Sequence, residues 1–240
     1  MARTGAPAQV RALLPLGGVV GSLFHRRAEL FAALRSDAAA RALVLRMTAY
    51  VVLFAGAYGL VIGIYAGGWQ VVYDLVKLPW VLLATLALSA ASLYLLNALA
   101  GARMSWAQTI AVVLTGLLAT VTVLLALLPV VAFLMFSGDR DYYFAVFINV
   151  VAFAIAGWCG ARFAMEATAA AHEDERTRGR CLAVMRWWMA VYGLVGMQMA
   201  WLLRPYFRQA DVFIRPLGEG GSVFEALARL VWKVLVAGWF

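Results

Sequence analysis

The sequence predicts an all-α membrane protein with about five transmembrane helices and an amphipathic segment at each end. Of its 240 residues, 65% are hydrophobic and only 13% are charged, whereas about 25% of residues are charged in soluble domains. The charges cluster between long uncharged segments, as a bilayer requires of helices that cross it. The predicted division is 1–41 as an N-terminal interfacial segment, 42–205 as the membrane domain and 206–240 as a C-terminal segment.

The net charge of +8 comes almost entirely from arginine, since Lys77 and Lys233 are the only lysines. These charges flank apolar segments, so anionic lipid headgroups are the expected partner rather than nucleic acid. The preference for arginine over lysine is typical of GC-rich bacterial genomes. We therefore expect a bacterial cytoplasmic (inner) membrane protein.

The N-terminal element covers residues 8–35, where apolar residues recur at helical spacing and arginines lie mostly on another side. Such a segment before a span usually lies along the headgroups, and a loose cytosolic tail is the alternative. The first span then runs over residues 43–66. Gly59, Gly63 and Gly67 recur every four residues there, which predicts a groove where another helix approaches closely.

Residues 68–78 are too polar and too short to span, so they predict an interfacial turn of helix. Pro79 then begins the second span at a first helical position, where its missing N–H is harmless, and this span ends near Gly101. The third span fills 106–136 without a charge. Because that length exceeds the apolar core, we expect a bend at Pro129.

The fourth span covers residues 143–165, and its helix continues into the polar stretch EATAAAHEDERTRGR, which supplies the largest cytosolic loop. The fifth runs between Arg186 and Arg204, with tryptophans near both ends, as is common at membrane interfaces. Residues 222–240 predict an amphipathic helix that lies on the membrane or against a partner. Its apolar side includes Phe224, Leu227 and Val231, and a sixth span there would bury two cations.

Most of the 20 lysines and arginines fall on the inner side if the N-terminus is cytoplasmic and five helices cross. This bias agrees with the positive-inside rule. The cations after the fifth span run against it, and either a sixth span or docking of the tail on protein explains them.

The sequence lacks the residue patterns of common catalytic and metal sites. No zinc motif or phosphate-binding glycine loop is present, and the predicted spans hold no carboxylate near their middle. We therefore expect no catalytic residue, cofactor or metal. Asn149 and Gln198 are the amides inside spans. They are predicted to join helices, or alternatively to line a polar pore.

Several short segments resemble the bacterial branch of the Yip1-type membrane proteins. They are Lys77-Leu78-Pro79, then Asn97 and Gly101, Pro129, and the segment GMQMAWLLRPYF. The resemblance covers about residues 42–216. It implies a non-enzymatic protein that acts in membrane organisation and trafficking through partners, with no catalytic residues to carry over.

These observations predict a non-enzymatic membrane subunit that anchors or organises a larger assembly through helix–helix contacts. Its partners would be other membrane subunits or further copies of the chain. The alternative is a channel or facilitator for a small solute, lined by uncharged polar residues of the third to fifth spans.

The orientation is testable with reporter fusions at Ser36, Asp139 and Gly179. We expect cytoplasmic signals at Ser36 and Gly179 and an external signal at Asp139, because arginines are retained on the inner side. An external signal at Gly179 would contradict the five-span topology.

Overall fold

A computed structural model describes residues 18–137 and 142–207, together with the single positions 213, 225 and 232. The regular structure in these residues is entirely α-helical. Two short helices come first and five long ones follow. Their bounds are α2 Gly18–His25, α3 Arg27–Leu34, α4 Asp37–Ala66, α5 Gln70–Leu99, α6 Trp106–Ser137, α7 Tyr142–Ala171 and α8 Glu175–Leu202.

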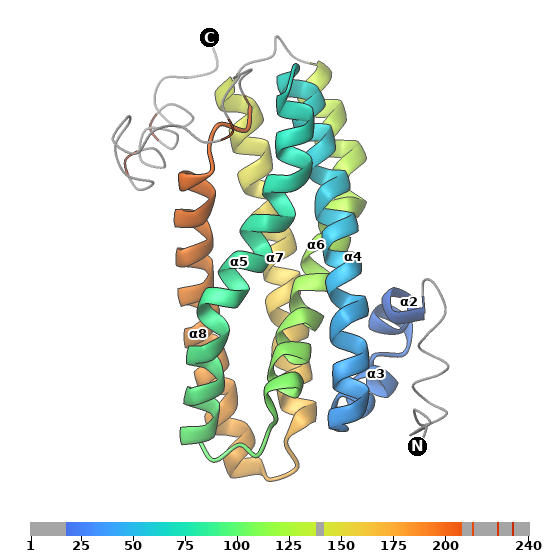
Figure 1. The fold of residues 1–240 in the computed structure, drawn as a ribbon, viewed down its shortest axis with the longest axis vertical. Helices are drawn as coiled ribbons and strands as arrows, with labels where there is room; N and C mark the ends of the chain where they lie inside the picture. Colours follow the sequence, from blue (N-terminus) through green and yellow to red (C-terminus); the bar gives the residue numbers. More distant parts are fainter. Residues whose placement is uncertain (1–17, 138–141, 208–212, 214–224, 226–231, 233–240) are drawn as a thin grey trace, which may run out of the picture.

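The long helices run alternately up and down in a bundle (Figure 1). The most extensive contacts join α6 to α7, α4 to α5 and α4 to α6, whereas α8 packs more lightly against α5 and α7. The short helices α2 and α3 lie beside the lower end of α4 in Figure 1, and the end of α8 lies at the upper end. The N-terminal helices and the segment after α8 are therefore at opposite ends of the bundle.

Four of the long helices, α4 to α7, are long and apolar enough to cross a membrane. The chain is therefore a helical membrane protein. Helix α8 is nearly as long, but its first turns contain the charged sequence ERTRGR. Its uncharged part runs only from Trp187 to its last residue, Leu202.

The prediction of an interfacial turn at 68–78 and a helix starting at Pro79 is wrong. Helix α5 begins at Gln70, and Pro79 lies inside it. Proline removes one backbone hydrogen bond, but packing tolerates this loss inside membrane helices. The polar residues Gln70, Asp74 and Lys77 in its first turns are buried. A turn of helix at the membrane interface would have exposed them to the headgroups.

One further expectation needs correction at the lower end of the bundle. The helix of the fourth span continues into the polar stretch after residue 165, as predicted, but the rest of this stretch begins α8 and does not form a long loop. Asp174 caps α8 by accepting a hydrogen bond from the Thr177 N–H. Hydrogen bonding from Thr177 holds the pKa of the Asp174 carboxyl below its ordinary value. The N-terminal helices lie on the bundle, with Leu23, Leu30 and Leu34 buried.

Helix α4 packs closely against α5 through three glycines. A Cβ on Gly59 would overlap the carbonyl oxygen of Asp74, and one on Gly63 would come within 2.6 Å of the Val71 Cα. Gly56 faces Leu75 one turn away. Only hydrogen at these Cα atoms permits this approach, so the contact depends on glycine.

Alanine at Gly59 or Gly63 should lower the free energy of unfolding by about 1–3 kcal/mol, because the added methyl meets backbone that cannot rotate away. Thermal unfolding of the purified protein in detergent measures the loss. Gly157 in α7 is the matched control, since a Cβ there meets nothing within 4 Å. Gly157→Ala should be neutral or stabilising. Equal loss in all three variants would contradict a specific contact.

Candidate functional site

Helix α8 is attached to α5 through side chains that donate to backbone carbonyls. Trp188 Nε1 donates to the Ser89 carbonyl at 2.8 Å, and the Tyr192 hydroxyl donates to the Leu82 carbonyl at 3.0 Å. Later residues of α8 contact earlier residues of α5, because the two helices are antiparallel neighbours. We call this line of contacts the α5–α8 seam.

A cluster of buried polar groups lies at the upper end of this seam. Gln70, Asp74 and Lys77 occupy one face of α5 and are 0%, 1% and 0% exposed. Lys77 Nζ donates to the Pro205 carbonyl oxygen at 2.8 Å and lies 3.8 Å from Asp74 Oδ1. The Gln70 amide donates to Asp74 Oδ1 at 3.1 Å and also to the Pro205 carbonyl. These three side chains and the Pro205 carbonyl form the buried polar cluster.

Aromatic rings surround the Lys77 ammonium. The Nζ atom lies 5.6 Å from the ring centroid of Tyr73, 5.4 Å from that of Tyr206 and 5.1 Å from that of Phe213. Such contacts attract a cation and exclude water from it. Burial and the nearby Asp74 carboxylate raise the pKa of the Tyr206 hydroxyl above its ordinary value.

The buried polar cluster has unused hydrogen-bonding capacity. Within the described part of the chain, Gln70 Oε1, Asp74 Oδ2 and the Tyr206 hydroxyl have no hydrogen-bond partner. Ionisable side chains buried in membrane helices are costly and often mark functional positions. Here the side chains of Gln70 and Lys77 connect α5 to the segment after α8. Their hydrogen bonds therefore hold the end of α8 against α5.

The predicted glycine residues divide into two groups. Gly59 and Gly63 face the backbone of α5. Gly67 instead follows the last residue of α4 with a positive φ of 82°, and a Cβ there meets nothing within 4 Å. Gly67 therefore ends the helix in a backbone conformation that suits glycine. It takes no part in the contact between α4 and α5.

The two predicted amides have opposite environments. Asn149 is buried, where its Oδ1 accepts from the Tyr58 hydroxyl at 2.9 Å and its Nδ2 donates to the Ala145 carbonyl at 2.8 Å. It thus joins α7 to α4. Gln198 is exposed on α8. Thr115, Thr120 and Thr122 each donate to a carbonyl of their own helix, so these polar groups do not converge on one lining.

The outer side of α8 is the least covered part of the bundle. Its buried residues are Cys181, Met185 and Trp188, so no position from Met189 to Leu202 is buried. Val191, Leu194 and Met197 are 49%, 47% and 43% exposed. A Cβ on Gly193 would meet nothing within 4 Å. We call Val191, Gly193, Leu194, Met197 and Gln198 the α8 outer face.

The remaining predicted contact residues, Phe224, Leu227 and Val231, lie outside the described residues. The sequence interpretation also missed Gln70, Asp74 and Lys77 as a group. Their spacing of four and then three residues places them on one helical face. That signal was present, but a helix predicted to begin at Pro79 separated these residues from the second span.

No family model, curated protein or solved structure matches this chain. The fold and the buried groups therefore define the class, a helical membrane protein with a buried polar cluster.

Replacing one member of the Asp74–Lys77 pair should destabilise the fold more than replacing both. Lys77→Met or Asp74→Asn leaves a buried group without its counter-charge, at a cost on the order of 3 kcal/mol. The double variant should recover part of that loss, and thermal unfolding in detergent measures the difference. Glu29→Gln, which breaks an exposed pair with Arg26, is the control and should change stability by about 1 kcal/mol or less. Strictly additive losses would contradict the coupling.

Proposed function

We propose that this protein is a non-enzymatic membrane subunit that anchors or organises a larger assembly through helix–helix contacts. The observation that carries the proposal is the α8 outer face. Hydrocarbon cannot hydrogen-bond an amide, so an exposed Gln198 on a membrane helix is best satisfied by a neighbouring helix. Gly193, with open space beside it, lets such a helix come close.

The contacts on the other side of α8 support the same proposal. Helix α8 is tied to α5 by hydrogen bonds at Ser89 and Leu82 and by the buried polar cluster. A helix held in this way keeps its orientation while its outer face remains uncovered. This is the arrangement that a subunit needs to present a fixed surface to a partner.

The proposal includes five crossings, with α8 as the fifth, in a bacterial inner membrane and with a cytoplasmic N-terminus. The alternation of α4 to α8 and the position of α2 and α3 at one end support it. The segment from Trp187 to Leu203 carries no charge. The sixteen residues of α8 from Trp187 to Leu202 extend roughly 24 Å, close to the apolar thickness of a bilayer.

A role in membrane organisation through partners also agrees with the resemblance to Yip1-type proteins. The residues 222–240 offer a second contact in this proposal, through the apolar side that includes Phe224, Leu227 and Val231. A solute channel or facilitator is the alternative, and it would require polar groups contributed by several copies of the chain.

Site-specific photocrosslinking tests the proposed contact directly. A photoreactive residue at Leu194 or Met197 should give a discrete protein adduct in native membranes, whereas one at Ile155, an equally exposed position of α7, should give none. Gly193→Leu should reduce the adduct from Met197 at least about tenfold, because bulk separates the helices. The matched variant Gly157→Leu should leave it unchanged.

The size of the adduct distinguishes another copy of the chain from a different subunit, and either result supports the proposal. Equal labelling from α7 and α8, or lipid adducts alone, would contradict it. A solute-flux measurement in liposomes would then test the channel alternative.

A further inference from the structure

A cavity of about 210 Å³ lies between α4 and α6, close to where both helices begin. Its lining is Arg41 and Val44 from α4 with Trp106, Ala107 and Ile110 from α6. The guanidinium of Arg41 is the only charged group in this lining. The cavity therefore offers an apolar wall with one cation at its edge.

The length of α4 gives the depth of this cavity in a membrane. Thirty residues extend roughly 45 Å, which matches a bilayer including both headgroup layers. The first turn of α4, with Asp37 and Arg41, then lies in one headgroup layer. The uncharged stretch from Met47 to Ala66 crosses the hydrocarbon. The cavity thus lies where a phosphate layer meets the acyl chains.

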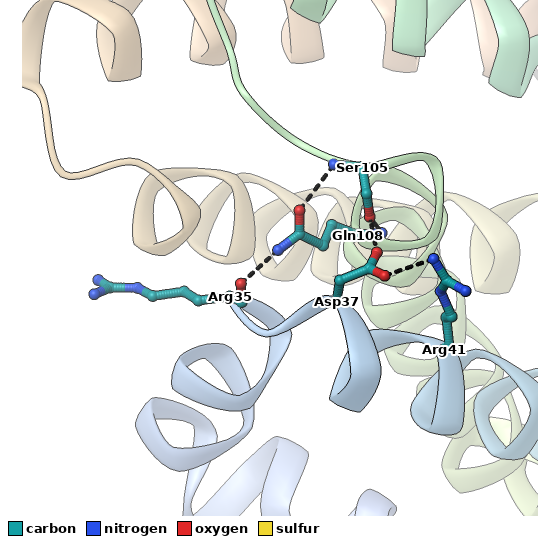
Figure 2. Close-up of polar contacts among 5 residues, drawn as sticks. All are labelled: Arg35, Asp37, Arg41, Ser105 and Gln108. Atoms are coloured by element: carbon teal, nitrogen blue, oxygen red, sulfur yellow. Dashed lines mark hydrogen bonds and ion pairs between the residues drawn. The ribbon is translucent and has the colours of Figure 1, made fainter. Parts of the chain in front are cut away.

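Arg41 is held from one side by a network of hydrogen bonds (Figure 2). Its Nη2 atom lies 2.7 Å from Asp37 Oδ2, and Asp37 also accepts a hydrogen bond from the Ser105 hydroxyl. Ser105 is held in turn by Gln108, whose side-chain oxygen accepts from the Ser105 N–H at 2.8 Å. The network fixes the guanidinium beside the start of α6.

The rest of the guanidinium faces outward. The Arg41 side chain is 72% exposed, and an arginine carries five N–H donors, of which the Asp37 contact uses few. Toward the membrane centre, the surface of α4 continues through exposed Leu45 and Val52. The Arg41 cation and the apolar residues that follow it along α4 are thus arranged like the headgroup and the acyl chain of a lipid.

We propose that this cavity binds one anionic glycerophospholipid. Its phosphate accepts hydrogen bonds from the outward donors of Arg41, since arginine and phosphate pair strongly and with two bonds. One acyl chain packs against Val44, Ala107 and Ile110, and Trp106 lies at the interface where indole rings are favoured. Basic pockets between membrane helices bind anionic headgroups in this way. Asp37 is a positioning residue, because it orients Arg41.

The test uses the purified full-length chain and native mass spectrometry, with phosphatidylglycerol and phosphatidylethanolamine as probes. Wild type should retain phosphatidylglycerol preferentially. Arg41→Gln should weaken its binding about tenfold, whereas Ala107→Leu should weaken both lipids by filling the cavity without changing charge. Arg41→Lys keeps the charge but loses the planar fork, so it should give an intermediate effect. The control is Arg162→Gln, at an exposed position of α7 outside the cavity, and it should bind as wild type does.

Three results would overturn the proposal. Equal loss in Arg41→Gln and Arg162→Gln would indicate diffuse attraction to the basic surface. Unchanged binding in Ala107→Leu would show that the cavity is not used. Equal retention of the two lipids by wild type would remove the anionic specificity. Because Ala107→Leu and Arg41→Lys leave a cation at position 41, they test the site even if Arg41→Gln fails to fold.

Discussion

The close approach of α4 and α5 is the contact on which the upper half of the bundle depends. Gly59 and Gly63 bring α4 against the backbone of α5 at Asp74 and Val71. That contact covers one side of the first turns of α5. The polar side chains Gln70, Asp74 and Lys77 in these turns are buried, and they contact the segment after α8. Lys77 then finds its partner in the Pro205 carbonyl, 128 residues away. The two glycines thus contribute to the position of α8, which the hydrogen bonds of Trp188 and Tyr192 to α5 also hold.

A second constraint is that hydrocarbon satisfies no polar group, so each one must find a partner within protein. Several buried side chains follow this rule. Asn149 joins α7 to Tyr58 of α4, and the threonines of α6 bond to their own backbone. Against that background, Gln198 on the α8 outer face stands out, because the same rule predicts a partner beyond this chain. This exposed amide is the observation from which the proposed role in assembly is argued.

Charged side chains are buried at one end of the bundle and exposed at the other. At the upper end, Asp74 and Lys77 are buried and enclosed by aromatic rings. At the lower end the ion pairs are exposed and connect separate elements: Arg27 of α3 contacts Glu166 of α7, and Arg35 contacts Glu173. Exposed pairs contribute little stability each, so their role is to set the positions of α2 and α3. Asp37 orients Arg41 beside an apolar cavity, which suits a lipid headgroup.

The sequence by itself determined the class of the protein and much of its helix content. Uncharged runs predicted α6 to within one residue and the end of α4 at Ala66, because solvation by lipid acts locally on each segment. The sequence did not determine where α5 begins, since Pro79 reads as a helix start unless packing compensates its lost bond. Nor did it separate Asn149 from Gln198, two amides with the same local pattern. Tertiary structure decided that one is buried against Tyr58 and the other exposed. A helical pattern defines faces, but only contacts between distant segments decide which face is covered.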